Sequence, residues 1–322
     1  MILKKAAKTL IVLLIFVGAI LLLWLNRYNI HDFIVLRGYK PPQTVAQLAV
    51  DDTMSSYGKR LFYVNKPQIS DKSSFNSECK STEQTIVLGC YTGSHIYIYK
   101  IVDPTLNGIE QVTAAHEMLH AAYDRLGPSE RAHVDALVEA AYKKLNDPRI
   151  NALADSYQKQ EPGSVPNELH SILGTEVSNV GPDLEVYYSK YFSNRAKIVA
   201  YAQNYEQVFE NLRSQVEKYD ADLALRKSQI TQKENDLNAQ ADQLATQKTN
   251  LDNLSASGQT RVYNTAVPNY NKAVDNYNVE VANIKSLIVE YNNIVQARNG
   301  VIIEQQNLAE SIDSRVNAIS NQ

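Results

Sequence analysis

The sequence predicts a chain of the α+β class, with a helical segment on each side of one mixed domain. Three observations support this fold class: an uncharged apolar run from Thr9 to Leu25, mixed strand and helix patterns between residues 51 and 195, and a seven-residue repeat in the last third. We therefore expect a transmembrane helix near the N-terminus, a domain with a small mixed sheet, and an antiparallel coiled-coil hairpin over residues 196–322.

The apolar run near the N-terminus predicts a membrane anchor. Its length approaches the ~20 residues that a helix needs to cross a bilayer, and Trp24 and Tyr28 suit the membrane interface. Three lysines precede the run, so we expect residues 1–8 in the cytoplasm and residues 9–25 in the plasma membrane as a single-pass signal anchor. A cleaved signal peptide is the alternative, but it needs small residues after the run, where 25–28 read Leu-Asn-Arg-Tyr.

Cysteine usage agrees with a location outside the cytoplasm. Cys79 and Cys90 are expected to form one disulfide in an oxidising compartment, with two free thiols as the alternative. They lack the CxxC spacing of a cysteine zinc site. The formal net charge of −3 gives no reason to expect nucleic acid as a partner.

The domain predicted at residues 51–195 follows a linker at 26–50, which Pro41-Pro42 would stiffen. Its clearest strand is 95–101, where side chains alternate with period two. Two more strands are expected at 60–64 and 85–88. Helices are expected at 109–126, at 129–145 with Ser129 as the N-cap, and from Pro166 to Leu173.

The last third of the chain predicts two long helices that fold back on each other. Apolar residues recur every seven positions in both arms, and residues 255–258 have the composition of a turn. Folding about that turn pairs the apolar residues of the two arms, from Leu251 with Tyr263 to Leu223 with Tyr291.

Two features of the second arm qualify this hairpin. Pro268 requires either a late start of the second helix, near Thr265, or a kink. A second apolar stripe also meets polar residues on the first arm: Val267, Val274, Val281 and Ile288 would face Gln247, Gln240, Lys233 and Arg226. This stripe is expected either to bind a partner helix or a second copy of the chain, or to be covered by the Lys and Arg stems.

The segment HEMLH at 116–120 carries the chemistry. His116 and His120 are four residues apart, so on a helix their imidazoles lie one turn apart on one face and can share a metal ion. Glu117 is placed to accept a proton from a metal-bound water, whose pKa zinc lowers towards neutral. Such a pattern can arise by chance, but the alanine-rich helix around it favours a Zn²⁺ site.

Zinc peptidases need a third protein ligand. Here the sequence resembles the gluzincin branch of HExxH peptidases over roughly residues 90–180, where a glutamate on a later helix completes the site. In those families a small residue follows the glutamate three positions on, and Glu168 and Ser171 have that arrangement after Asn167. The resemblance therefore implies Glu168 as the third ligand.

Two other residues remain candidates for that ligand, and one partner is not identified. Glu176 is the main alternative and His170 a weaker one. Ile172 stands where many gluzincins carry an acidic residue, so the residue that hydrogen-bonds one of the ligand histidines is not identified. The metzincin pattern is absent after His120.

The resemblance also implies a zincin-like fold and further roles. An edge strand just before the active-site helix pairs with extended substrate in that family, a role that falls here to Ile96, Tyr97, Ile98 and Tyr99. A tyrosine or histidine usually stabilises the oxyanion, and the candidates are His170, Tyr123, Tyr157, Tyr187 and Tyr188.

These expectations combine into one predicted function. The chain is expected to be a membrane-anchored, extracytoplasmic zinc endopeptidase that hydrolyses peptide or protein substrates with a metal-activated water. The hairpin would position the enzyme or bind a helical partner. Two alternatives stay open: a catalytically inactive envelope scaffold that binds partners through its coiled coil, and a hydrolase of cell-wall peptides.

Overall fold

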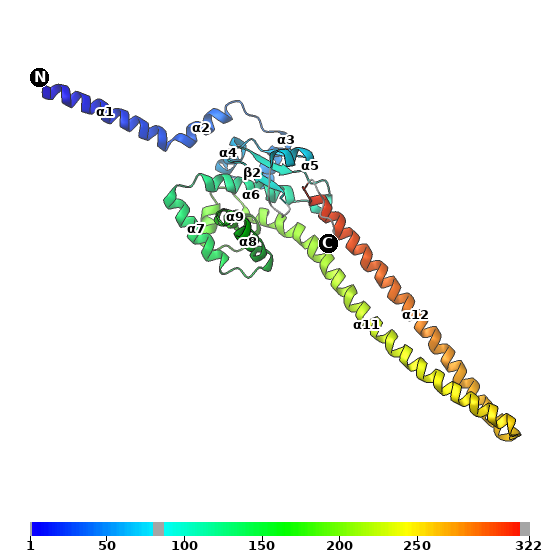
Figure 1. Cartoon of the computed structure of the whole chain (residues 1–322). Helices are drawn as coiled ribbons and strands as arrows, with labels where there is room; N and C mark the ends of the chain where they lie inside the picture. The colour runs from blue at the N-terminus through cyan, green and yellow to red at the C-terminus, as the bar shows by residue number, and fades with distance from the viewer. Residues whose placement is uncertain (1, 80–86, 316–322) are drawn as a thin grey trace. The chain divides into compact units, whose positions relative to one another are not determined.

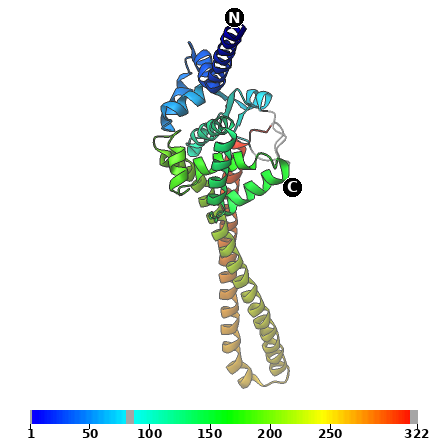
Figure 2. The same cartoon turned by 90° about the vertical axis from the view of Figure 1, so that its left-hand side faces the viewer.

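A computed structural model describes the backbone of residues 2–79 and 87–315, with side chains from Leu13 onward (Figures 1 and 2). The chain divides into two compact units. The first comprises Met1–Gln207 with Glu310–Gln322, and the second comprises Val208–Ala309. The first unit carries the HEMLH segment and all the strands of the described residues.

The elements follow one another in this order. The first part of the chain forms α1 (Ile2–Leu25), α2 (Arg27–Leu36), α3 (Gln43–Asp51), α4 (Ser56–Val64), β1 (Gln68–Ser70), α5 (Lys72–Glu78), β2 (Gly89–Tyr91), β3 (Ile96–Tyr99) and a 3₁₀ turn at Pro104–Leu106. The rest forms α6 (Ile109–Asp124), α7 (Pro128–Tyr142), α8 (Pro148–Gln160), α9 (Val165–Glu176), α10 (Pro182–Tyr188), α11 (Arg195–Ala256) and α12 (Thr260–Ile312).

The three strands form the small mixed sheet that the sequence predicts. Their order is β1-β3-β2, with β1 parallel and β2 antiparallel to β3. The period-two segment forms the central strand β3, in which Ile96 and Ile98 are fully buried. The structure is therefore mostly helical with a small mixed sheet, which fits the α+β class loosely.

Helix α6 lies at the centre of the first unit. It buries twelve of its sixteen residues, and it contacts β2 and β3 on one side and α3, α4 and α9 on others. Four of the buried residues are alanines at 114, 115, 121 and 122, and their small side chains allow neighbouring elements to approach closely. The HEMLH helix is thus held rigidly by the core.

Several predicted elements differ in the structure. The strand predicted at 60–64 is wrong, because α4 begins after Ser55, whose side chain accepts a hydrogen bond from the Gly58 amide and caps a helix. Of the strand predicted at 85–88, Thr85 and Ile86 lie outside the described residues, and β2 begins only at Gly89. Helix α7 begins at Pro128 with Gly127 as its N-cap, so Ser129 is inside the helix.

The expected linker contains two helices. In α3, Val45, Leu48 and Ala49 are buried in the main core, so the folded unit begins before residue 51. Helix α2 is fixed through Asp32, a buried carboxylate that accepts two hydrogen bonds from the Arg125 guanidinium, at 2.7 and 2.8 Å. Arg125 caps the C-terminal end of α6, so α2 is tied directly to the HEMLH helix.

Where side chains are described, no one helix has both the length and the apolar character to cross a bilayer. Leu13–Leu25 and Arg27–Leu36 meet that test only together, and a bend of 59° separates them.

The second unit is an antiparallel pair formed by α11 and α12, which lie side by side in both views (Figures 1 and 2). The chain reverses at Gly258, whose φ of 72° is the left-handed conformation that glycine adopts readily. In the pairing repeat every residue within this unit is buried or half-buried: Phe209, Val216, Leu223, Ile230, Leu237, Leu244, Leu251, Tyr263, Tyr270, Tyr277, Ile284 and Tyr291. Ile288 of the second stripe is 38% exposed. The hairpin and its register therefore agree with the repeat.

Two details of the hairpin refine the prediction. Helix α12 begins at Thr260 and contains Pro268, so the expected late start near Thr265 is wrong. Lys233 and Arg226 form ion pairs with Glu280 and Glu290, at 2.9 and 3.2 Å. These contacts favour the alternative in which Lys and Arg stems cover the valine stripe.

The C-terminal end of α12 belongs to the first unit. There Ser314 donates a hydrogen bond to the Val87 carbonyl at 2.5 Å, and Asn76 donates one to the Ser314 carbonyl. Ser314 is buried, so this contact holds the residues just before β2 from outside the sheet.

Asp52, at the end of α3, makes stability depend on pH. Both of its carboxylate oxygens are buried and lack a hydrogen-bond partner among the described residues, and burial, reinforced by the Asp51 charge, raises its pKa well above the ordinary value. A raised folded-state pKa gives stability that is present below the unfolded-state pKa and lost as the pH rises through the folded value.

We therefore expect Asp52→Asn to raise the unfolding temperature at pH 8 and to leave it unchanged near pH 4. The gain at pH 8 comes from removing the cost of keeping this buried carboxyl folded above its unfolded-state pKa, a cost that asparagine does not carry. Thermal unfolding of the metal-free full-length protein at both pH values measures it. An equal shift at both pH values would show that removal of the charge is not the cause.

Candidate metal centre

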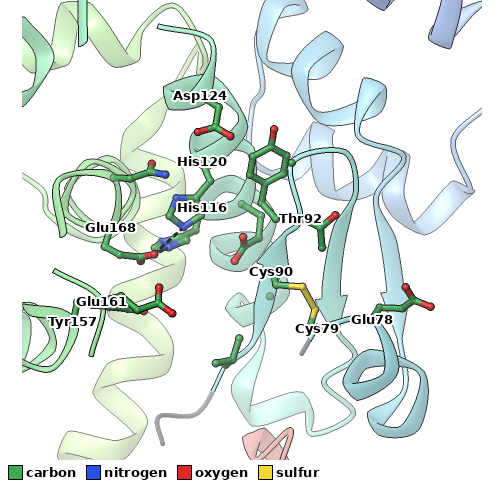
Figure 3. Close-up of a pocket in the computed structure, with 16 residues that line it drawn as sticks. Glu78, Cys79, Cys90, Thr92, His116, His120, Asp124, Tyr157, Glu161 and Glu168 are labelled. Atoms are coloured by element: carbon green, nitrogen blue, oxygen red, sulfur yellow. Dashed lines mark ion pairs between the residues drawn. A yellow bond between two sulfur atoms is a disulfide. The ribbon is translucent and has the colours of Figure 1, made fainter. Parts of the chain in front are cut away.

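The two histidines of α6 and the first-turn glutamate of α9 meet at one point (Figure 3). Nε2 of His116 lies 3.5 Å from Oε2 of Glu168, and Nε2 of His120 lies 3.5 Å from Oε1 of the same carboxylate. Donor atoms about 2.1 Å from a tetrahedral zinc ion lie about 3.4 Å apart. The spacing and the chemistry of the donors therefore fit a zinc ion bound by two imidazoles and one carboxylate.

Ser171 orients one of the two histidine ligands. Its hydroxyl lies 3.3 Å from Nδ1 of His120, and both residues are buried. The contact occupies the Nδ1 side of the ring, so Nε2, which lies 3.5 Å from Glu168, is the nitrogen that is placed to bind a metal. The sequence motif predicts a small residue at Ser171, and its contact with His120 depends on how α9 packs against α6.

The surroundings of Glu168 keep it ionised. Burial alone would raise the pKa of this carboxyl, but a hydrogen bond from His116, the charges of both histidines and a hydrogen bond from Tyr157 together bring the pKa below its ordinary value. A carboxylate that stays charged when it is mostly buried is the form that binds a cation.

Glu117 lies beside the histidines against strand β2. Its side chain is 5% exposed, and it lines the same cavity as both histidines. Gly89 permits this position, because a Cβ atom there would lie 2.7 Å from Oε1 of Glu117 and 2.5 Å from Cγ2 of Thr113. The missing side chain at 89 thus leaves room for the carboxylate next to the metal position.

Strand β2, not β3, forms the wall of the cavity. The prediction that residues 96–99 are an edge strand for substrate is wrong, because β3 pairs with β1 on one side and with β2 on the other. The three-residue β1, which occupies the far edge, is too short to be recognised from period-two alternation. Gly89, Cys90 and Tyr91 of β2 line the cavity, and β2 is an edge of the sheet that the described strands form.

The disulfide predicted between Cys79 and Cys90 is present. Cys90 is in β2 and Cys79 caps α5, so the bond ties the edge strand to the helix before it. Both cysteines line the cavity (Figure 3). Together with the contact between Ser314 and Val87, the bond fixes the position of this wall.

Most of the predicted oxyanion candidates lie outside the cavity. The Tyr123 hydroxyl donates to Asp135 at 2.7 Å, and that of Tyr188 donates to the His170 carbonyl at 2.7 Å. His170 is completely buried with Nε2 2.9 Å from the Tyr187 hydroxyl, and burial lowers its pKa to about 3, so it is neutral. Of the five, Tyr157 alone lines the cavity, where it contacts Glu168.

Glu176 and His170, the alternative ligands, do not join the metal group. Glu176 is eight residues beyond Glu168 on α9, about 12 Å along the helix axis. Its carboxylate pairs with Arg149 at 2.7 Å, and Arg149 also pairs with Glu206 at 2.7 Å. Among the described residues, the group within metal-binding distance consists of His116, His120 and Glu168.

The cavity around these residues has a volume of about 520 Å³ and an acidic lining. Besides Glu117 and Glu168, the lining includes Glu78, Asp124 and Glu161, and no lysine or arginine of the described part of the chain belongs to it. A cavity of this charge favours cationic groups.

Comparison with known proteins adds no assignment: no family model matches the chain, and no curated protein or solved structure is significantly similar to it.

The ligand set predicts an order of zinc affinities. Glu168→Ala removes a donor atom, so its loss of affinity should exceed the ~10–100-fold that follows loss of an outer hydrogen-bond partner. Ser171→Ala should fall within that range, and Glu176→Ala should bind zinc as the wild type does. Competition with a chelator measures the three constants, and a larger loss for Glu176→Ala than for Glu168→Ala would refute this ligand set.

Gly89 provides a test of the Glu117 position. Gly89→Ala should keep zinc binding yet reduce any metal-dependent hydrolysis by about 100-fold, the cost of displacing a catalytic group by about 1 Å. Gly127→Ala is the matched control, because a Cβ there meets nothing within 4 Å. Equal rates for both variants would mean that Glu117 does not act from this position.

Proposed function

We propose that the chain is a membrane-anchored zinc-dependent endopeptidase of the gluzincin type, with its catalytic domain outside the cytoplasm. One observation carries the proposal: His116, His120 and Glu168 converge in a cavity that also contains the Glu117 carboxylate and an edge strand. Two imidazoles, one carboxylate ligand and a neighbouring second carboxylate are the groups that zinc hydrolases use.

Each residue has a role in hydrolysis. Zinc bound by the three ligands would supply a Lewis acid that lowers the pKa of a water towards neutral. Glu117 accepts the proton of the attacking water and returns it to the leaving amine. Ser171 holds His120 in the tautomer that exposes Nε2, and Tyr157 hydrogen-bonds Glu168 and keeps it charged.

The substrate is an extended peptide. Strand β2 is an edge of the described sheet and lines the cavity, so a peptide can add to its outer side as a further strand. The acidic residues Glu78, Asp124 and Glu161 along the cavity favour peptides with lysine or arginine side chains. The apolar run at 9–25 and the lysines before it support the anchor and its orientation.

The test compares Glu117→Gln with wild type on a library of unstructured peptides, with cleavage sites read by mass spectrometry. Wild type with zinc should cleave, preferentially near basic residues. Glu117→Gln should keep close to one zinc per chain and lose about 10²–10⁴-fold in rate, the usual worth of a general base. Glu139→Gln, a change on the exposed face of α7, is the control and should retain full activity.

Other outcomes identify the alternatives. A zinc-loaded wild type that cleaves no peptide would favour the envelope scaffold with an inactive domain. Cleavage confined to isolated cell-wall peptides would favour the wall hydrolase. Full activity in Glu117→Gln would contradict the proposed mechanism.

A further inference from the structure

Helix α2 exposes an apolar face away from the domain. Ile30, Phe33 and Ile34 are 39%, 70% and 65% exposed. At 100° per residue Ile30 and Ile34 lie about 160° around the helix from Asp32 and Phe33 about 100° from it, and Asp32 is 1% exposed and bound to Arg125. The apolar face of α2 is therefore exposed, while Asp32 attaches the helix to the end of α6 through Arg125.

Positive charge surrounds this face. Arg27, Arg37 and Lys40 are exposed, while Asp32, the single acidic residue between 26 and 41, is buried and neutralised by Arg125. Arg27 stacks on the rings of Trp24 and Tyr28, with its guanidinium carbon 4.6 and 4.4 Å from their centroids. Apolar side chains flanked by arginine, lysine and aromatic rings are typical of helices that lie in the headgroup layer of a bilayer.

Helix α2 also follows directly on the apolar helix α1. One residue, Asn26, separates them, and the bend of 59° turns α2 away from the axis of the preceding helix. If α1 crosses the bilayer, α2 starts at its surface and runs closer to the membrane plane than to the normal.

We propose that α2 lies in the headgroup layer of an anionic phospholipid bilayer and holds the metal cavity beside the membrane surface. The inference rests on the membrane anchor of the proposed function. A lipid surface is favoured over a protein partner because the face is continuous with the anchor and carries uncompensated positive charge.

The position of the cavity follows from the contact between Asp32 and Arg125. Arg125 is five residues beyond His120, about 8 Å along the axis of α6. A second cavity, lined by Arg27, Tyr28 and His31, shares Tyr91, Gly93 and Asp124 with the metal cavity, so the two are contiguous. The substrate class that follows is a peptide segment close to the membrane surface.

Depth-dependent fluorescence quenching in the full-length chain tests the proposal. Trp24 is the one tryptophan, so Phe33→Trp in a Trp24→Phe background places a single reporter on the α2 face. The protein is reconstituted in phosphatidylcholine–phosphatidylglycerol vesicles brominated at shallow or deep positions of the acyl chain. Val186→Trp in the same background is the control, because Val186 has the same 70% exposure as Phe33.

The expected result is that the indole introduced by Phe33→Trp is quenched most by shallow bromines, and less so in vesicles without phosphatidylglycerol. The indole introduced by Val186→Trp should not be quenched. Strongest quenching of the α2 reporter by deep bromines would show a broken span instead, and no quenching would show contact with water or protein; either overturns the proposal.

Quenching of native Trp24, measured in the unsubstituted chain, distinguishes failure of the membrane anchor from failure of the α2 inference. If Trp24 is not quenched, the anchor itself is wrong. Quenching of Trp24 without quenching of the α2 reporter rejects the α2 inference alone.

The preference for substrates close to the membrane is measured separately, as cleavage rates of the active protein. The same cleavable peptide is supplied free or attached to vesicles by an acyl chain and a short spacer. The combined variant Ile30→Ser, Phe33→Ser and Ile34→Ser should lose rate on the anchored peptide and keep it on the free one. Unchanged rates on both peptides would contradict a membrane-proximal cavity.

Discussion

The close approach of α9 to α6 is the contact on which the candidate site depends. Gly174 makes it possible, since a Cβ there would lie 2.4 Å from Leu119 of α6 and 2.8 Å from Tyr188. Three residues earlier on the same face, Ser171 is small enough to reach His120. This packing places the first turn of α9, with Glu168, directly opposite both histidines. Larger residues at 171 or 174 would separate the helices and the ligands with them.

The other contacts of α6 arrange everything else around that pair. On one side β2 lies against Glu117, and the disulfide and the Ser314 contact hold β2 in place from two directions. At its C-terminal end Arg125 fixes α2, which follows directly on α1. One rigid helix therefore relates the candidate metal ligands, Glu117, strand β2 and helix α2.

Features set by local spacing could be predicted from the sequence. The separation of four positions from His116 to His120 suffices to place both on one face, and the seven-residue repeat suffices to set the hairpin register. Features set by tertiary pairing could not. Strand β2 is an edge of the sheet and β3 is not, because β1, which has only three residues and no recognisable alternation, pairs with the other side of β3. Residues 60–64 have the composition of a strand but are helical, in a helix that Ser55 caps. Four of the five oxyanion candidates lie outside the cavity, and Tyr157 lines it, because only packing decides which tyrosine faces the cavity.

Zinc-edge X-ray absorption on the zinc-loaded full-length protein tests the central claim most directly. We expect two imidazole nitrogens and carboxylate or water oxygens at about 2.0–2.2 Å, with no sulfur, and the loss of a carboxylate oxygen in Glu168→Ala. Sulfur in the coordination sphere, or a spectrum unchanged in Glu168→Ala, would contradict it.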